Sequence, residues 1–347
     1  MTGTSMGNRA WRGLLAVAAL GLVVGNAAAQ EAKPDKPKEY RLSVAVGPAF
    51  ALGKAGERWV KLIGEKSGGR VAAALHPGAT LAQRDPGREF LALRDGAADL
   101  AVGSSLHWSA QVKELGVVGL PWLAPEPRQL DALAQGDVAA ALAAAVERAG
   151  AVPLAFAPLG HRELATWTRA VHTPADAAGL KVRIAAVPML SDLYTGLAAQ
   201  AVAVAFAGAQ SAFASGALDA QEGPVALFAS TRLYALGAKH VTVWNGVGEI
   251  AVFAVNRAVW DGWSAAERDA VRDAARDAAR ELPELVRQEA ATAAAELRAR
   301  GMTVATLTAA GRAAFATAAR PVYEKWAAAA GEEITRLAET AVKAATP

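Results

Sequence analysis

The chain has 347 residues, with 36 Lys and Arg against 33 Asp and Glu, a formal net charge of +3, and no cysteine. Without cysteine the sequence offers no disulfide, no thiol nucleophile and no thiolate metal ligand, so the fold must rely on a buried core. The length exceeds the roughly 250–300 residues that a single core usually supports, which predicts two lobes.

The first 29 residues have the pattern of a secretory signal peptide. Arg9 and Arg12 precede an apolar run at 14–24, and a small-residue segment ends at Ala29. This run is shorter than the roughly 20 residues that span a bilayer, so we expect cleavage near Ala29 and export to the periplasm, not an uncleaved anchor. Cleavage removes two Arg and leaves 34 − 33 = +1. Such a weak charge, without a basic run among aromatics, predicts no nucleic-acid partner.

A polar, Pro- and Lys-rich spacer is expected at 30–39, and apolar runs then alternate with segments of helical spacing. This alternation predicts βαβ units and an α/β fold with a sheet covered on both faces. Ser264 and Glu267 form a capping box at the start of a long helix. The expected strands are 41–47, 70–76, 99–103, 152–157, 181–184, 240–244, 250–255 and 303–306. The expected helices are 53–67, 88–94, 131–148, 188–197, 210–215, 264–300 and 309–345, the last with a break near Gly331.

Motifs for catalysis are missing from the sequence. It has no Gly-x-Ser-x-Gly, no phosphate-binding Gly-rich loop and no His-Glu-x-x-His, and its five histidines lack metal-ligand spacing. We therefore predict a protein that is not an enzyme, that has no cofactor and that has no metal-ligating residues of its own; the sequence leaves open whether a metal ion assists ligand binding.

Arg183 is the most informative charged residue, because it lies inside the apolar strand Lys181–Ile184. A buried Arg needs a counter-charge. An internal Asp or Glu could supply it, and so could a ligand carboxylate held by the two-pronged guanidinium. The residue types alone leave both alternatives open.

Several short motifs, in a shared order, carry a family resemblance. Gly179-Leu-Lys-Val-Arg-Ile184 is followed by Phe206 and then by Gly216-Ala-Leu-Asp-Ala-Gln-Glu222. Leu120-Pro-Trp-Leu123 precedes them, and Gly301-Met302 follows. This pattern resembles the periplasmic receptor subunits of tripartite ATP-independent periplasmic (TRAP) transporters, the DctP family. The resemblance extends over nearly the whole chain after the signal peptide.

The resemblance implies an α/β fold of the type II periplasmic-binding-protein class, with two lobes around a ligand cleft bridged by a long helix. Matching segments place lobe I at 40–160 and 249–288, and lobe II at 161–248 and 289–347. The implied function is capture of a small organic carboxylate by an Arg–carboxylate pair with lobe closure. The implied partners are that acid and the membrane subunits of a TRAP transporter, and we expect a monomer. A receptor of the same fold for an ATP-driven transporter or a sensor kinase is the main alternative, and an enzyme on a two-lobe fold is a weaker one.

The resemblance also implies the ligand-binding residues. Arg183 takes the place of the Arg that pairs with the substrate carboxylate, and Arg162, after Gly160-His161, matches a second family Arg. Phe206 matches the aromatic that packs on the ligand, while Trp244 and Asn245 match a segment that often lines the cleft. Structural alternatives are a solvated Arg162 and a core position for Phe206, while the sequence leaves the roles of Trp244 and Asn245 open.

Two positions depart from the family pattern. Gly223 stands where many members have an Asn that contacts the ligand, and Ala220 replaces a Gly. Losing the Asn removes a polar contact and leaves room beside Arg183, which favours a bulkier or less hydroxylated acid, such as an aromatic or branched one. These departures also leave open a protein that keeps the fold without binding a ligand.

Overall fold

The computed structural model describes residues 38–204 and 206–346, so the expected signal peptide and most of the spacer lie outside the described residues. Nine strands in the described part form one mixed sheet. They are β1 (Glu39–Val44), β2 (Ala72–His76), β3 (Leu100–Ser104), β4 (Ala151–Thr166), β5 (Lys181–Ile184), β6 (Gln200–Ala203), β7 (Ala220–Gly223), β8 (His240–Asn256) and β9 (Thr303–Thr306). Their order is β2-β1-β3-β8-β4-β7-β5-β6, and β9 pairs with β8.

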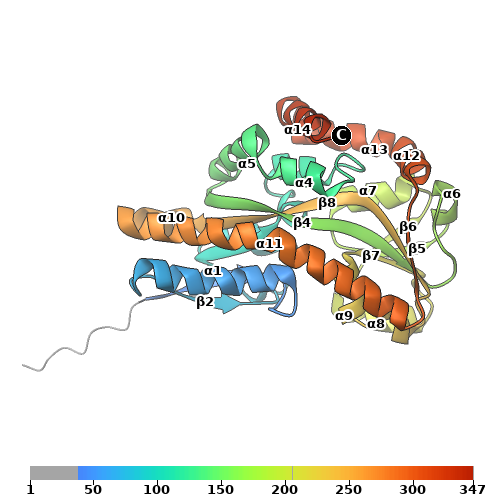
Figure 1. Cartoon of the computed structure of the whole chain (residues 1–347), viewed down its shortest axis with the longest axis horizontal. Coiled ribbons are helices and arrows are strands. Elements are labelled where there is room, and N and C mark those ends of the chain that lie inside the picture. Colours follow the sequence, from blue (N-terminus) through green and yellow to red (C-terminus); the bar gives the residue numbers. More distant parts are fainter. Residues whose placement is uncertain (1–37, 205, 347) are drawn as a thin grey trace, which may run out of the picture. The chain divides into compact units, whose positions relative to one another are not determined.

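Helices connect and cover these strands (Figure 1). The helices before β5 are α1 (Ala51–Ser67), α2 (Glu89–Arg94), α3 (Ser105–Trp108), α4 (Pro127–Leu133), α5 (Gly136–Arg148) and α6 (Pro174–Ala177). Those between β5 and β8 are α7 (Pro188–Gly196), α8 (Phe206–Ala214) and α9 (Val225–Ser230). The later ones are α10 (Arg257–Gly262), α11 (Ala265–Ala299), α12 (Ala309–Ala318), α13 (Arg320–Ala330) and α14 (Glu332–Ala344). No helix in the described ranges is long and apolar enough to cross a membrane.

Two long strands, β4 and β8, form an antiparallel ribbon through the middle of the sheet. The sequence predicts only 152–157 of β4, and it predicts two strands, 240–244 and 250–255, where β8 is continuous. The two-strand prediction was wrong because Asn245, Gly246 and Gly248 resemble a turn. In the structure these glycines allow close packing, since a Cβ on Gly246 would lie 2.9 Å from the Trp122 ring and one on Gly248 2.9 Å from Leu130.

The parallel strands approach the middle of this ribbon from opposite ends. β1 is parallel to β2 and β3, and β5 is parallel to β6 and β7. β3 runs antiparallel to β8, and β7 runs antiparallel to β4. β3 therefore ends at Ser104 opposite Ala251, and β7 ends at Gly223 opposite Glu163. The carboxyl ends of both groups of strands meet over the centre of the ribbon, which is the place where α/β sheets bind ligands.

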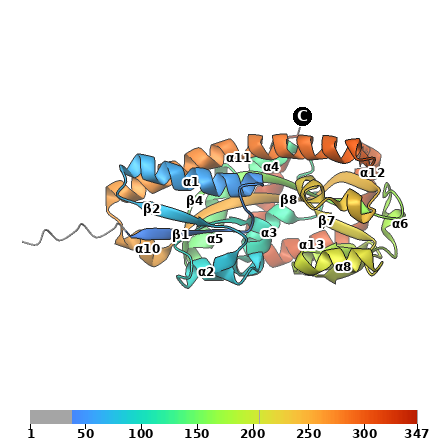
Figure 2. The same ribbon diagram turned by 90° about the horizontal axis from the view of Figure 1, so that it is seen from below.

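Helices pack on both faces of the ribbon, as the sequence predicts. In Figure 1, α11 lies below β4 and β8 while α4, α5 and α14 lie above them. Figure 2 shows α1 and α11 side by side, and their small and apolar residues share one buried cluster with β1, β3 and β8. The predicted capping box at Ser264 and Glu267 starts α11, and Pro283 lies inside this helix without ending it.

Two segments that the sequence predicts as helical are divided into shorter helices in the structure. Residues 131–148 form parts of α4 and α5, separated near Gly136, whose φ of 56° favours glycine. Residues 309–345 form three helices with the expected break at Gly331, where φ is 119°. These C-terminal helices contribute Phe315, Val322 and Ile334 to the buried clusters, so they close the core on the face opposite α11.

Candidate ligand-binding site

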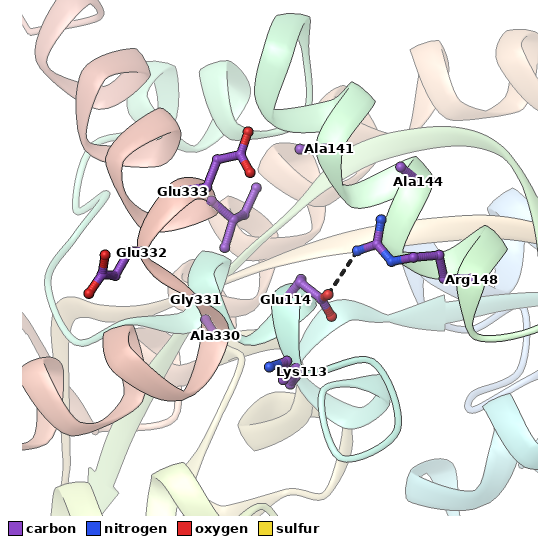
Figure 3. A pocket seen from close by; sticks show the side chains of 10 residues that line it. Lys113, Glu114, Ala141, Ala144, Arg148, Ala330, Gly331, Glu332 and Glu333 are labelled. Atoms are coloured by element: carbon purple, nitrogen blue, oxygen red, sulfur yellow. Dashed lines mark hydrogen bonds and ion pairs between the residues drawn. The ribbon is translucent and has the colours of Figure 1, made fainter.

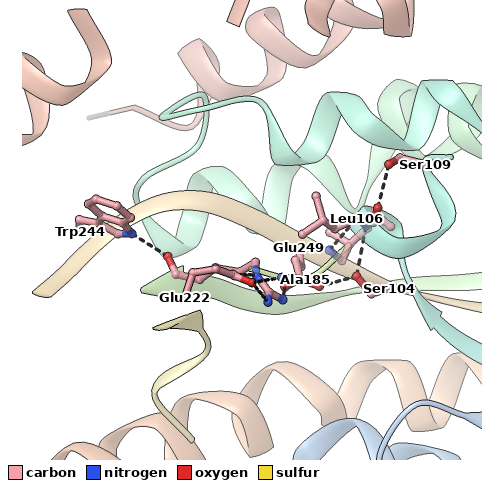
Figure 4. Close-up of polar contacts among 10 residues, drawn as sticks. Ser104, Leu106, Ser109, Ala185, Glu222, Trp244 and Glu249 are labelled. Carbon is pink, nitrogen blue, oxygen red and sulfur yellow. Dashed lines mark hydrogen bonds and ion pairs between the residues drawn. The ribbon is translucent and has the colours of Figure 1, made fainter. Parts of the chain in front are cut away.

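A cluster of buried charges lies where the strands converge on the ribbon, and Arg162 is its centre. Figure 4 shows the two carboxylates of the cluster, Glu222 and Glu249, together with Ser104. The Nε of Arg162 donates to Oε2 of Glu222 at 2.5 Å, and Nη2 donates to Oε1 of the same carboxylate at 2.8 Å. Its Nη1 donates to Oε1 of Glu249 at 2.6 Å. The three side chains are at most 8% exposed, so this is a bidentate ion pair joined to a second one inside the protein.

The two carboxylates connect the cluster to strands on either side. Glu222 of β7 also accepts a hydrogen bond from the backbone N–H of Ala185, 2.7 Å away and just beyond β5. Glu249 of β8 accepts from the hydroxyl of Ser104 at the end of β3. Arg162 of β4 is thus linked through Glu222 to β7 and to the residue after β5, and through Glu249 to β8 and to the end of β3.

The electrostatics of the cluster favour its charged form. Burial disfavours the Arg162 cation, but the carboxylates of Glu222 and Glu249 outweigh it and raise the pKa of Arg162. Burial also disfavours ionisation of Glu249, but Arg162, His107 and the Ser104 hydrogen bond together lower its pKa. Arg162 and Glu249 therefore remain ionised across the neutral range.

Arg183 lies beside this cluster, one strand beyond Glu222. It is 7% exposed, and its Nε donates to the carbonyl of Val204, 3.1 Å away, after the end of β6. Burial lowers the pKa of Arg183; Glu222 opposes this shift, and Arg162 adds to it. The structure thus brings together Arg162 and Arg183, two of the residues that the family resemblance implies.

Phe206 cannot be placed in the same way. The backbone at Phe206 begins α8, but its side chain lies outside the described residues. Its predicted contact with the ligand stays a prediction.

Trp244 lies in the core at 1% exposure. Its indole Nε1 donates to the carbonyl of Arg162 at 2.9 Å, and its ring packs edge-on against Trp122 and Phe315. Asn245 donates from its amide to the carbonyl of Pro125 at 2.8 Å. Both residues are thus tied to protein groups, and their role as ligand contacts stays a prediction that this placement does not favour.

Glu163 binds the backbone of this same segment. It accepts from the N–H groups of Trp244 and Asn245 at 2.8 and 3.0 Å, at a bulge between Arg162 and Leu164. Burial raises the pKa of Glu163 to about 8, because the two backbone hydrogen bonds offset only part of the desolvation. Glu163 therefore stabilises the ribbon beside the site through its two backbone hydrogen bonds.

Gly223 ends β7 next to Arg162. Its φ is 151°, and an added Cβ would lie 2.9 Å from Cδ2 of Leu227 and 3.9 Å from Nη2 of Arg162. The position is close to the cluster, as the resemblance implies. It also favours glycine for steric reasons, because the backbone at this position would strain any side chain, including the Asn that many family members have here.

Sequence reasoning left the partners of Arg162 undefined. Glu222 belongs to a recognised motif, but Glu249 and Ser104 are far from Arg162 in the sequence. The only signal for Glu249 is a charged residue inside an otherwise apolar run, the same signal that identifies Arg183.

A surface hollow elsewhere is a weaker candidate (Figure 3). It is lined by Lys113, Glu114, Arg148 and the segment 330–334, with alanines of α5. Nη2 of Arg148 donates to Glu114 at 2.9 Å, so these two charges satisfy each other. In the described part of the chain no group of His, Asp and Glu side chains could hold a metal ion.

Comparison with known proteins identifies the fold and the family. The family model for bacterial extracellular solute-binding proteins of family 7, DctP, matches residues 42–329. The chain belongs to this family. The TRAP and DctP resemblance of the sequence is thereby confirmed, as is the type II periplasmic-binding fold.

A TRAP periplasmic solute-binding protein from Ralstonia eutropha H16 is 40% identical, with a TM-score of 0.84 over 88% of this chain and 99% of that one. Its structure contains bound (S)-2-hydroxy-2-methyl-3-oxobutanoate, which is (S)-2-acetolactate. A solute-binding protein of Verminephrobacter eiseniae is 29% identical over 76% of this chain and 78% of its own. The uncharacterized protein y4mM of Sinorhizobium fredii is 30% identical over 64% of this chain, and the match spans only 41% of that longer protein. The family and the fold are those of substrate-binding receptors.

Proposed function

We propose that this DctP protein captures a small organic carboxylate through Arg183 and delivers it to a TRAP-type membrane transporter. The observation that carries the proposal is a buried guanidinium at the carboxyl end of β5, next to a cluster in which Glu222 and Glu249 are both bonded to Arg162. Burial lowers the pKa of Arg183, so an anion placed against it would offset part of the desolvation of the cation.

The shape of the acid follows from two observations. The Ralstonia relative, at 40% identity, contains a short, branched 2-hydroxy-3-oxo acid. In this chain Gly223 supplies no polar side chain beside Arg162. A short branched or aromatic acid therefore fits the proposed site better than a chain of hydroxyl groups, each of which would need a hydrogen-bond partner.

Closure of two lobes is part of the same proposal. The lobe boundaries 160/161 and 248/249 fall inside β4 and β8, and 288/289 falls inside α11. Register shifts in the ribbon lie between Pro158 and Gly160 and between Arg162 and Leu164. Bulges bend strands locally, so the ribbon is suited to act as a hinge below the charge cluster. Export to the periplasm, cleavage near Ala29 and a monomeric state complete the proposal.

The test is calorimetric titration of residues 30–347 with (S)-2-acetolactate, 2-oxoisovalerate, mandelate, galactonate and glucuronate. At least one of the first three should bind, and Arg183→Ala should weaken it by at least ~30-fold, since truncating one side of a buried charge pair costs 2–5 kcal/mol. Arg320→Ala is the matched control, because Arg320 is an exposed residue of α13 that pairs with Glu324. Equal binding by wild type and Arg183→Ala would refute the role of Arg183, and a clear preference for the two sugar acids would refute the ligand class.

A further inference from the structure

Gln221 of β7 has a buried amide nitrogen without a partner. The residue is 1% exposed, and its Nε2 has no hydrogen bond to any residue in 38–204 or 206–346. A buried donor left unsatisfied is rare and costs about 1–3 kcal/mol, so it calls for an explanation.

The strand register places Gln221 on the same sheet face as Arg183. The parallel strands β5 and β7 pair Arg183 with Gln221, and the antiparallel pair β4 and β7 sets Ala165 opposite Gln221. Paired residues of neighbouring strands point to the same face and lie about 4.8 Å apart. Glu222, the next residue, points to the other face, where it bonds Arg162.

These neighbours explain why the amide nitrogen lacks a partner. Ala165 is fully buried and presents only a methyl group, and a guanidinium carries donors but no acceptor. Arg183 and the Gln221 amide are therefore two sets of donors side by side on one face. An oxygen anion with several lone pairs can accept hydrogen bonds from both and would satisfy the buried amide nitrogen of Gln221.

We propose that the ligand carboxylate accepts hydrogen bonds from Gln221 Nε2 and from the Arg183 guanidinium at the same time. This inference rests on the proposed function, and it assigns to the binding site a residue beyond those implied by the family resemblance. The amide adds a neutral donor that fixes the plane of the carboxylate without adding charge to the cluster. In the unliganded receptor the same amide is a stability cost, which binding removes.

The experiment uses Gln221→Met, which keeps the length of the side chain and removes the donor. The affinity should fall about tenfold for each acid of the panel above that binds, because the carboxylate is common to all of them. The melting temperature of the unliganded protein should rise, because the unsatisfied donor is gone. Affinity and unliganded stability thus change in opposite directions.

Gln129→Met is the matched control. Gln129 is also buried, but its Oε1 accepts from the N–H of Glu126 at 3.0 Å and its Nε2 donates to Thr346 at 2.9 Å. Replacing this satisfied amide should lower the melting temperature and leave every affinity unchanged. Gln221→Leu is the second variant, to be used if Gln221→Met does not fold, with the same expectations.

The outcomes separate the two proposals. Unchanged affinities in the Gln221 variants, with loss of binding in Arg183→Ala, would overturn this inference and leave the proposed function intact. Isovalerate, which has no oxygen on the carbon beside its carboxylate, separates the two contacts. If it binds the wild type and its affinity is unchanged in Gln221→Met while the other acids lose affinity, the amide contacts the substituent and the inference is overturned. If no acid binds the wild type, the proposed function fails first and this inference fails with it. Failure of both Gln221 variants to fold would show that the amide is structural.

Discussion

Replacement of Arg162 by Met tests whether the buried cluster stabilises the protein through its charges. The change keeps a long apolar side chain but removes all three hydrogen bonds to the carboxylates. Glu222 and Glu249 are then left at 0% and 8% side-chain exposure without their cation. Breaking a buried ion pair by removing one partner costs about 3–5 kcal/mol, and two carboxylates share this partner.

The penalty should depend on pH in a defined direction. In the wild type the pKa of Glu249 is lower in the folded protein than in the unfolded chain. Its contribution to the free energy of unfolding is therefore complete above its pKa in the unfolded chain, and it is lost as the pH falls through its pKa in the folded protein. In Arg162→Met both buried carboxyls should have raised pKa values and take up protons on folding. The variant should therefore recover stability relative to wild type as the pH falls from 7 to 5.

Urea unfolding at pH 7 and pH 5 measures both effects. We expect a loss of about 3–5 kcal/mol at pH 7 and a clearly smaller loss at pH 5. The triple variant Arg162→Met with Glu222→Gln and Glu249→Gln should regain much of the stability at pH 7, because no buried charge remains unpaired. A loss below about 1 kcal/mol for the single variant, equal at both pH values, would refute the view of Arg162 as the cation of an ionised cluster.

Three further predictions follow from other buried positions. Burial raises the pKa of Glu89 to about 8, so between about pH 4.5 and 8 the folded protein binds a proton that the unfolded chain has lost. The free energy of unfolding of the wild type should therefore fall as the pH rises over this range. In Glu89→Gln, a series of thermal melts should show a melting temperature that changes less with pH over the same range. Trp244→Ala should cost about 3–5 kcal/mol by urea unfolding, whereas Trp244→Phe should leave the affinity for a bound acid within about twofold, because the ring is enclosed by Trp122 and Phe315. A larger loss of affinity in the Phe variant would place the Trp244 ring against the ligand. Gly223→Ala should cost about 1–3 kcal/mol by chemical unfolding, since its φ of 151° and the 2.9 Å approach to Leu227 both oppose a Cβ, and an unchanged stability would show that the loop adapts.

The sequence predicted the elements whose signals are local. The strand Lys181–Ile184 and the capped helix that begins after Ser264 were found where predicted, because apolar runs and capping boxes depend on neighbouring residues. The continuity of β8 was missed, because the reason for its glycines is packing against Trp122 and Leu130, which are more than a hundred residues away in the chain. Local glycine patterns do not distinguish a turn from a close approach.

The site was predictable in its motifs and unpredictable in its pairings. Arg183 was identifiable because a charge inside an apolar strand needs a partner. The partners of Arg162 come from β7 and β8, 60 and 87 residues away along the chain, and only the register of the ribbon brings them together. The family resemblance implies a cleft position for Trp244, and its ring packs against Trp122 and Phe315, which come from distant segments of the chain.

The pairing of Arg162 with two carboxylates suggests different roles for Arg162 and Arg183. A ligand carboxylate at Arg162 would reach only the N–H groups that Glu222 and Glu249 leave over, and it would be a third anion beside two buried carboxylates that share this one cation. A carboxylate that binds Arg183 breaks none of the three hydrogen bonds of Arg162. It also meets the unsatisfied donor of Gln221 on the same sheet face. The energetically easier arrangement keeps Arg162 as the fixed centre that positions Glu222, and uses Arg183 as the group that the ligand contacts.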